Sequence, residues 1–312
     1  MSKFLDGVTG GLRNRPLRVT LYGTRGVGKS TWAKDAPSPI FMDENGGTDE
    51  LDVKRFPRIN SFPDALIALD ELRTDKHDYQ TFVLDTADWL EPLIWKHVCE
   101  KGILGKNGKR EPAENLEAWS YGKGYLVALD EWRVVISKLE SLEDDRNMNI
   151  VILAHSHVKS IDPPDSEKYD VYQMKLNRMS AALIGEWTKA LLFATFEVYT
   201  VKEDKTDKRS RAKAYGEGAR IVHTSPRPAW EAKSRYPLPA KLPLSWDEFE
   251  RYARRRVEGQ TKDASAQIEE LLGKVDDVTV TQGRAALCRC GADPEKLSKL
   301  LEWLRGKVLT AA

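Results

Sequence analysis

A glycine-rich loop near the start of the chain constrains the fold more than any other feature of the sequence. The segment GTRGVGKS, residues 23–30, follows a short apolar stretch at 17–22 and precedes a predicted helix over 29–34. Glycines let the backbone curl until several N–H groups point at one phosphate chain, and the following helix adds the positive end of its dipole. The spacing therefore predicts a P-loop that binds a nucleoside triphosphate between a strand and a helix.

The chemistry of the loop predicts the individual contacts. Lys29 is expected to supply a positive charge to the β- and γ-phosphates of the nucleotide, and the Ser30 hydroxyl is expected to ligate Mg²⁺. The predicted nucleotide-binding residues are Gly23, Thr24, Arg25, Gly26, Val27, Gly28, Lys29, Ser30 and Thr31. The alternative is a glycine turn with an incidental lysine, which the preceding strand and following helix disfavour.

Composition narrows the class of protein. The 312 residues are 41% hydrophobic and 31% charged, as in an ordinary globular protein with a sizeable core. A formal net charge of +1 gives no global basic field, so any contact with nucleic acid must depend on local patches. Three cysteines, no long apolar run and no signal-like N-terminus predict a cytoplasmic protein without a membrane partner.

Short apolar strands alternate with helical segments along most of the chain. Strands are predicted at 17–22, 39–43, 81–85, 149–155, 191–201 and 219–224, the last two joined by an exposed hairpin tip at 202–213. Helices are predicted at 63–73, 126–139 and 178–190, and long polar loops at 101–125 and 156–177. This alternation predicts an α/β fold with a mostly parallel twisted sheet flanked by helices.

The pattern changes after residue 246, where only helical segments follow. We expect an N-terminal arm at 1–15, a nucleotide-binding core at 16–258 and a small helical C-terminal domain at 263–312, with a boundary near 258–262. Leucines at helical spacing predict the core of that small domain, which would bind DNA, a single-strand-binding protein or a neighbouring subunit. Cys288 and Cys290 lack two further ligands at suitable spacing, so we expect free thiols there.

Acidic and imidazole side chains at strand ends are candidates for the remaining chemistry. Asp85 ends the strand 81–85 and is the natural carboxylate for Mg²⁺, with Thr86 and Asp88 as lesser candidates. Glu44, after the strand 39–43, is the candidate that orients the attacking water, unless 43–50 is a solvated acidic turn. His155 is a candidate γ-phosphate sensor and His157 a weaker one, although a strand-end histidine can also be structural.

These segments together resemble the phage-encoded, RecA-like core ATPases, also called phage nucleotide-binding proteins, which include single-strand annealing recombinases. The resemblance covers about 17–248. It is carried by the P-loop and by the segments 46–57, 77–95, 120–132, 151–159 and 230–239. It implies a P-loop NTPase of RecA-like (ASCE) type that uses ATP and Mg²⁺ in the host cytoplasm. It also implies a homo-oligomer, ring or filament, on single-stranded DNA in recombination.

The resemblance also implies roles for individual residues. Lys29 and Ser30 match the phosphate and Mg²⁺ ligands, and Asp85 matches the Walker B acid. Lys233 and Arg235 resemble the K-x-R element that reaches a neighbouring subunit's γ-phosphate, where the alternative is a solvated basic turn. One position departs from the family pattern, because Asn45 stands where relatives carry glutamate. The identity of the water-activating residue, Glu44 or another, therefore stays open.

Two segments combine cations with aromatic side chains, as suits single-stranded DNA without sequence preference. In the first, the predicted DNA contacts are Lys106, Lys109, Arg110 and Lys123, with Trp119, Tyr121 and Tyr125 nearby. In the second they are Lys159, Lys175 and Arg178, with Tyr169 and Tyr172 nearby. The alternative for both is an ordinary solvated loop, and the acidic residues of the second segment dilute its charge.

Together with these residues, the resemblance implies a DNA-stimulated recombination ATPase of annealing or strand-exchange type. One alternative is a helicase-like RecA-fold motor, although no additional helicase motif is visible. A second is an ATP-gated scaffold that hydrolyses poorly and recruits replication or recombination proteins. A small-molecule kinase is less favoured, since neither a lid nor an acceptor-binding pattern is visible.

Overall fold

The computed structural model describes residues 8, 10, 15–44, 46–105, 108–165, 167–202, 212–215, 218–272, 277–290 and 294–311. Most of the predicted N-terminal arm lies outside these residues. The chain divides into two compact units, one formed by Pro16–Glu250 and one that includes the described residues from Arg251 onward. Each unit is described by itself.

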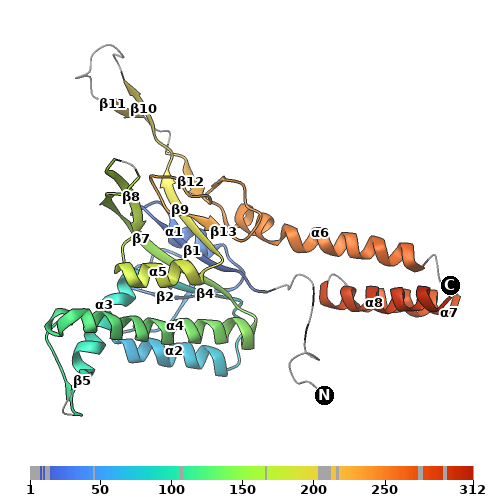
Figure 1. Ribbon diagram of the computed structural model, residues 1–312, viewed down its shortest axis with the longest axis horizontal. Coiled ribbons are helices and arrows are strands. Elements are labelled where there is room, and N and C mark those ends of the chain that lie inside the picture. Colours follow the sequence, from blue (N-terminus) through green and yellow to red (C-terminus); the bar gives the residue numbers. More distant parts are fainter. Residues whose placement is uncertain are drawn as a thin grey trace. The chain divides into compact units, whose positions relative to one another are not determined.

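A ten-stranded, mostly parallel sheet forms the centre of the first unit (Figure 1). Its strands in spatial order are β14 (Lys241–Pro243), β12 (Arg220–His223), β9 (Ala190–Phe196), β1 (Arg18–Gly23), β7 (Asn149–Ile161), β4 (Thr81–Asp85), β2 (Pro39–Asp43) and β3 (Lys54–Arg55). Two further strands pair at its margins, β13 (Lys233–Ser234) with β9 and β8 (Tyr169–Met174) with β7. The six strands from β9 to β3 are parallel, which confirms the predicted α/β class.

The strand order identifies the type of P-loop fold. β7 lies between β1, which leads into the glycine-rich loop, and β4, which ends in Asp85. In register, Gly23 pairs with His155 and Leu153 pairs with Asp85. An additional strand between the P-loop strand and the strand of the Mg²⁺ carboxylate defines the ASCE arrangement, which includes RecA-like folds. The predicted fold class is therefore confirmed.

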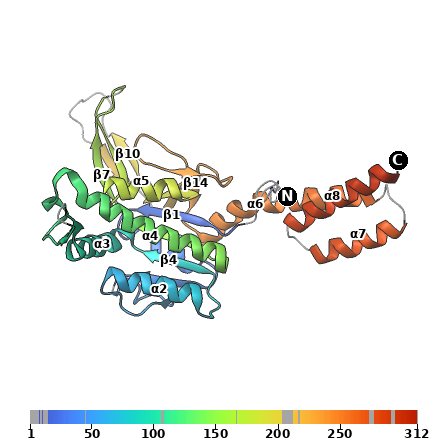
Figure 2. The ribbon, with the colours of Figure 1, turned by 60° about the horizontal axis from the view of Figure 1, so that its bottom comes forward.

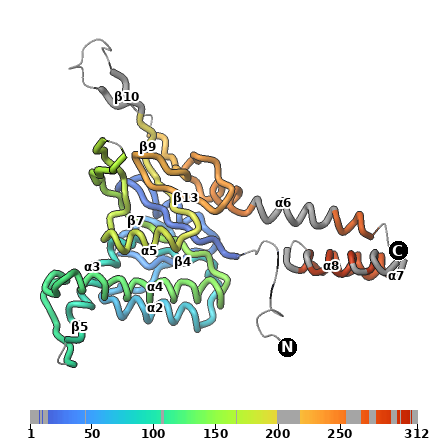
Figure 3. The backbone as a smooth tube through the Cα atoms, in the orientation of Figure 1, coloured from blue at the N-terminus to red at the C-terminus, as the bar shows by residue number. Residues whose placement is uncertain are grey.

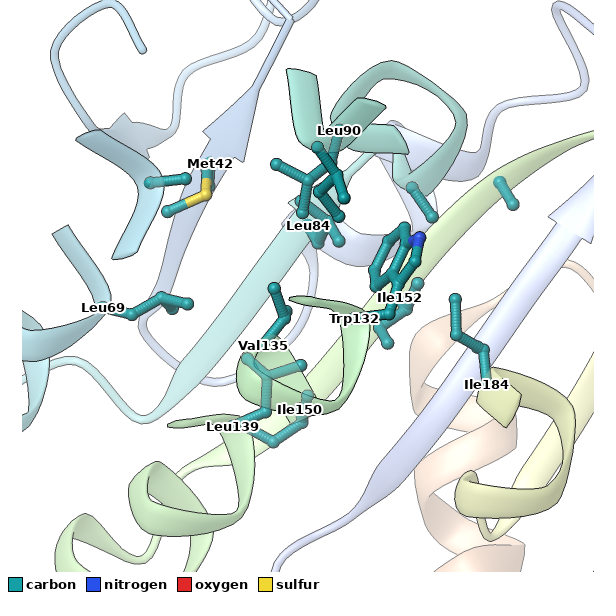
Figure 4. Close-up of a cluster of buried hydrophobic side chains, with 14 of the residues drawn as sticks. Met42, Leu69, Leu84, Leu90, Trp132, Val135, Leu139, Ile150, Ile152 and Ile184 are labelled. Atoms are coloured by element: carbon teal, nitrogen blue, oxygen red, sulfur yellow. The ribbon is translucent and has the colours of Figure 1, made fainter. Parts of the chain in front are cut away.

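Helices cover both faces of the sheet (Figures 1 and 2). The helices of this unit are α1 (Lys29–Lys34), α2 (Phe62–Thr74), α3 (Ala87–Lys101), α4 (Lys123–Arg146), α5 (Arg178–Trp187) and the start of α6 (Trp246–Leu272). Side chains of α2 to α5 and alternate residues of the strands form one buried cluster (Figure 4). Trp132 of α4 is fully buried in it, in the same cluster as Leu84 of β4, Ile152 of β7 and Ile184 of α5 (Figure 4).

The opposite face of the sheet carries α1. Trp32 of this helix is buried against two aromatic residues of α6, with ring centroids 4.8 Å from Trp246 and 5.5 Å from Phe249. Burying three large aromatic side chains contributes several kcal/mol, so this contact fixes the short helix that follows the glycine-rich loop.

The prediction of a polar loop at 156–177 is mostly wrong, because the end of β7 and the whole of β8 lie in this segment. β7 continues from the buried sheet to Ile161 and pairs antiparallel with β8, Ser156 with Met174 and Ile161 with Tyr169. Pro163 and Pro164 lie between the two strands, where a residue without an N–H disrupts no ladder hydrogen bond. The polar composition hid a hairpin that extends beyond the edge of the main sheet.

The predicted loop 101–125 and the helix after it also need correction. β5 (Ile103–Leu104) and β6 (Arg110–Glu111) form a small antiparallel pair, and two short 3₁₀ turns follow at 116–118 and 120–122. α4 then begins three residues earlier than predicted and ends at Arg146, well beyond Leu139. It ends where Asn147 adopts a left-handed conformation, φ 55°, as asparagine often does after a helix. α4 lies alongside α2 (Figures 1 and 3).

The predicted strand 191–201 is two separate strands. β9 ends at Phe196, and β10 (Tyr199–Lys202) pairs with β11 (Ala212–Tyr215) instead of with the main sheet. The predicted hairpin tip at 202–213 lies largely outside the described residues. The returning strand is β12, which pairs antiparallel with β9 as Phe196 with Arg220.

The described residues of the second unit from Arg251 onward are helical. α6 runs without interruption through 258–262, where the sequence suggested a break, and the division between units falls at 250/251. α7 (Asp277–Cys290) and α8 (Pro294–Ala311) follow. The buried cluster of this unit contains Ile268, Leu272, Leu297, Leu300 and Leu304. Among the described residues, no helix is both long enough and apolar enough to cross a membrane.

Candidate active site

The glycine-rich loop connects β1 to α1 at the carboxyl edge of the sheet. Gly23 leaves β1 so close to β9 that a Cβ added to it would lie 2.1 Å from the Ala194 carbonyl oxygen. Gly28 ends the loop with φ 99°, a conformation that side-chain-bearing residues rarely adopt. The Trp32 N–H donates to the Gly28 carbonyl, 2.9 Å, and begins the helix. These two glycines give the loop its path.

Lys29 points back into the loop. Its buried ammonium donates to the carbonyl oxygens of Gly23, 3.3 Å, and Thr24, 3.2 Å. Burial lowers the pKa of Lys29, while the carboxylates of Asp85 and Asp88 oppose that shift. A buried cation that the protein neutralises only in part is well suited to an anionic phosphate chain.

Ser30 and Asp85 meet directly. The Ser30 hydroxyl donates to Asp85 Oδ2 at 2.5 Å, and the other carboxylate oxygen accepts no hydrogen bond within the described part of the chain. Burial raises the pKa of Asp85, and the Ser30 hydrogen bond and the Lys29 charge oppose this. Mg²⁺ prefers oxygen ligands and a carboxylate, and this pair supplies both. The residues present therefore fit an Mg²⁺ ion, with Ser30 and Asp85 as the side chains that would hold it.

At the end of β2, the side chain of Asp43 is buried and that of Glu44 is exposed. Asp43 is buried and its Oδ2 accepts hydrogen bonds from the Thr48 N–H, 3.1 Å, and hydroxyl, 2.6 Å, so it fixes the turn that follows. The Glu44 N–H donates to the Asp85 carbonyl, 2.9 Å, which holds its backbone beside the Mg²⁺ carboxylate. Asn45 lies outside the described residues.

His155 is held by Asp88. The backbone N–H and the ring Nδ1 of His155 each lie 2.8 Å from one oxygen of the Asp88 carboxylate. A carboxylate only accepts hydrogen bonds, so Nδ1 carries the proton and Nε2 is left for other partners. Burial acts on Asp88 most strongly and alone would raise its pKa, but the hydrogen bonds from His155 outweigh it and lower the pKa to about 2. Asp88 therefore orients the candidate sensor, a role the sequence did not assign to it.

His157, the weaker sensor candidate, lies elsewhere. It is two residues further along β7 and lines a hollow beside the β7–β8 hairpin. The described residues contain no group of three or more histidine, cysteine or acidic side chains that could hold a metal ion on their own. Cys288 and Cys290 are free thiols in the structure.

The comparisons with known proteins agree with this site. Residues 15–236 match the model of an AAA domain (AAA_24), well over half of the chain. The chain belongs to the AAA domain family. Its core is therefore a P-loop ATPase domain, a class that typically binds ATP and Mg²⁺. None of the curated proteins matches the sequence.

The solved structures that match include a RadB recombinase. Its crystal structure has a TM-score of 0.34 and 11% identity, covering 71% of this chain and 94% of that chain. At that TM-score the likeness carries no argument about this protein.

Lys233 and Arg235 lie away from the P-loop of this ATPase core. Lys233 pairs with Leu191, and the Arg235 N–H donates to the Lys189 carbonyl, 2.9 Å, so both lie at the start of β9. The P-loop is reached only at Ala194, roughly 10 Å further along at about 3.3 Å per residue. Lys233 is half-buried and its ammonium donates to the Glu186 carbonyl, 3.0 Å. The fold does not bring either residue into the site of its own subunit.

The predicted DNA contacts fall at two places. Those described in the first segment are exposed and lie around the β5–β6 pair and the start of α4: Lys109, Arg110 and Lys123. Those of the second segment are exposed and lie on β7, after β8 and at the start of α5: Lys159, Lys175 and Arg178. Lys106 lies outside the described residues. The fold brings each set to the surface, but the two sets lie on separate elements.

Most of the aromatic side chains of these two segments are partly buried and pack against the core. Trp119, Tyr125 and Tyr172 pack against the buried cluster, and Tyr172 stacks on Phe193 with a centroid distance of 5.0 Å. Only Tyr121 among those of the first segment is fully accessible, at 97%. The expectation of several free stacking platforms is therefore not met.

Proposed function

We propose that this protein is an ATP- and Mg²⁺-dependent recombination ATPase that binds single-stranded DNA and assembles on it as a homo-oligomer. The observation that carries the proposal is the continuity of β7. This strand pairs with the P-loop strand as far as His155 and then runs directly into the β7–β8 hairpin, which bears exposed cations. A change at the phosphates can therefore reach the hairpin through one strand.

The cations beside the β7–β8 hairpin favour the binding of an extended, anionic ligand. A hollow of about 340 Å³ lies between the hairpin and α5, and the cations Lys159 and Arg178 line it together with Glu186 and Glu231. The Lys175 N–H donates to the His155 carbonyl, 2.8 Å, so a third cation is tied to the sensor histidine. Cations in a groove are what a single-strand phosphate backbone requires.

Assembly is the second part of the proposal. Lys233 and Arg235 resemble an element that acts on a neighbouring subunit, and their distance from the P-loop of their own subunit suits that role. Charge grows on the phosphoryl oxygens in the transition state, so a cation supplied in trans would accelerate hydrolysis only in the oligomer.

The experiment measures DNA affinity as a function of salt, together with ATP hydrolysis with and without single-stranded DNA. Replacing Lys159, Lys175 and Arg178 by alanine should reduce the slope of log affinity against log salt by about 2, at 0.7 per lost phosphate contact. The matched control replaces three exposed lysines elsewhere, Lys54, Lys76 and Lys96, and should leave the slope unchanged.

Three results would decide against the recombinase. Wild-type protein without salt-sensitive DNA binding and without DNA-stimulated hydrolysis would refute it. Directional strand separation would favour a helicase-like motor. ATP-dependent assembly with near-zero turnover would favour the scaffold.

A further inference from the structure

Arg220 is a cation without a described partner next to the P-loop. It begins β12, on the far side of β9 from β1, and its carbonyl accepts a hydrogen bond from the Leu244 N–H, 3.0 Å. The side chain is exposed. Within the described part of the chain its guanidinium makes no hydrogen bond or ion pair, although arginines usually find acceptors near folded backbone.

The guanidinium lies against the last glycine of the loop. A Cβ placed on Gly28 would lie 2.8 Å from Arg220 Nη1, whereas the Leu244 side chain would be 3.8 Å away. Gly28 directly precedes Lys29, so a residue distant in sequence places a further positive charge beside the P-loop. Packing alone does not explain this placement, because an exposed guanidinium gains little from contact with a glycine.

Strand order indicates which part of the nucleotide Arg220 faces. Asp85 and His155 belong to β4 and β7, on one side of β1, and Arg220 approaches across β9 from the other side. The γ-phosphate of a bound nucleotide would lie toward Ser30 and Asp85, because these side chains would hold the Mg²⁺ that neutralises charge on the transferred phosphate. The α-phosphate end of the chain then lies toward Arg220.

We propose that Arg220 binds the α- and β-phosphates of the nucleotide within its own subunit. A guanidinium donates two parallel hydrogen bonds to phosphate oxygens, which a single ammonium does not. Arg220 would therefore hold the part of the nucleotide that is not transferred, while Lys29 and Asp85 act on the part that is. The proposal rests on the nucleotide site of the proposed function, and it does not depend on DNA binding.

The experiment titrates the full chain with Mg·ADP and with Mg·ATPγS. Arg220→Ala should weaken both ligands by a similar factor, about tenfold for one charge-assisted contact, and Arg220→Lys should recover part of the loss. Arg227→Ala, a nearby exposed arginine, is the matched control and should bind as the wild type does. Melting curves without nucleotide should coincide, which separates a contact to phosphate from a structural role.

Other outcomes overturn the inference in distinguishable ways. Unchanged affinity for both nucleotides removes Arg220 from the site. A loss for Mg·ATPγS alone places Arg220 at the γ-phosphate instead and contradicts the strand-order argument. If the wild type binds neither nucleotide, this inference and the proposed function fail together. If Arg220→Ala lowers the affinity for both nucleotides and the wild-type protein does not bind DNA, the proposed function fails and this inference stands.

Discussion

The contact between Asp88 and His155 gives the sharpest quantitative prediction. The Asp88 side chain is only 11% exposed, so solvent screens its interactions weakly. The fall of its pKa from 3.8 to about 2 corresponds to roughly 2.4 kcal/mol in favour of the folded carboxylate. Asp88→Asn keeps the shape and one acceptor but loses the charge. We expect the variant to be less stable by about 2 kcal/mol at neutral pH.

The pH dependence follows from the direction of the shift. A depressed carboxyl pKa contributes stability that is fully present above the unfolded pKa of about 3.9 and is lost as the pH falls through the folded value. The difference in free energy of unfolding between wild type and Asp88→Asn should therefore be constant from pH 7 to 5. By integration, about half of the difference remains at pH 3.

The assay is urea unfolding at a series of pH values, read as the shift in midpoint at constant slope. Asp162→Asn changes an exposed aspartate of the β7–β8 turn and should shift the midpoint very little at any pH. The role assigned to the His155 hydrogen bonds would be refuted if the two proteins had the same urea midpoint at pH 7. It would also be refuted if the difference in midpoint were as large at pH 3 as at pH 7.

Three further predictions test the site and the core. Mixing Lys29→Ala with Arg235→Ala should restore more hydrolysis than the sum of the two alone, and no gain would contradict a role for Arg235 in the site of a neighbouring subunit. Glu44→Gln should lower turnover about 10²- to 10⁴-fold with nucleotide affinity kept, whereas Asp43→Asn should mainly lower the urea midpoint. Glu91 is buried, with one oxygen unpartnered in the described structure and a raised pKa, so Glu91→Gln should be the more stable protein at pH 7. A raised carboxyl pKa lowers the stability of the folded protein only at pH values above the pKa of the unfolded chain. The difference in urea midpoint between Glu91→Gln and wild type should therefore shrink toward pH 4.

The sequence predicted the features that depend on local chemistry. The glycine spacing of residues 23–30 located the loop and α1 to the residue, and the short apolar runs 39–43 and 81–85 coincide with β2 and β4. Such runs are bounded by residues that end a strand, so their limits are visible without tertiary information.

The features that the sequence missed depend on contacts between distant segments. β8 has only six residues and follows a polar turn, and only its pairing with the extension of β7 makes it a strand. Asp88 is two positions into α3, and nothing nearby indicates that it holds His155. Arg220 reaches Gly28 because β12 returns beside β9, a topology that single-sequence periodicity does not reveal.

Because Trp32 packs against Trp246 and Phe249, its intrinsic fluorescence can report on the position of α1. Trp32 is two residues after Ser30, in the helix that follows the P-loop, and its indole N–H is buried without an acceptor among the described residues. Any shift of α1 when a nucleotide arrives changes the electric field and the aromatic neighbours that this indole senses. Occupancy of the P-loop can thus be followed by intrinsic fluorescence, with Trp32→Phe assigning the signal and no label attached to the protein.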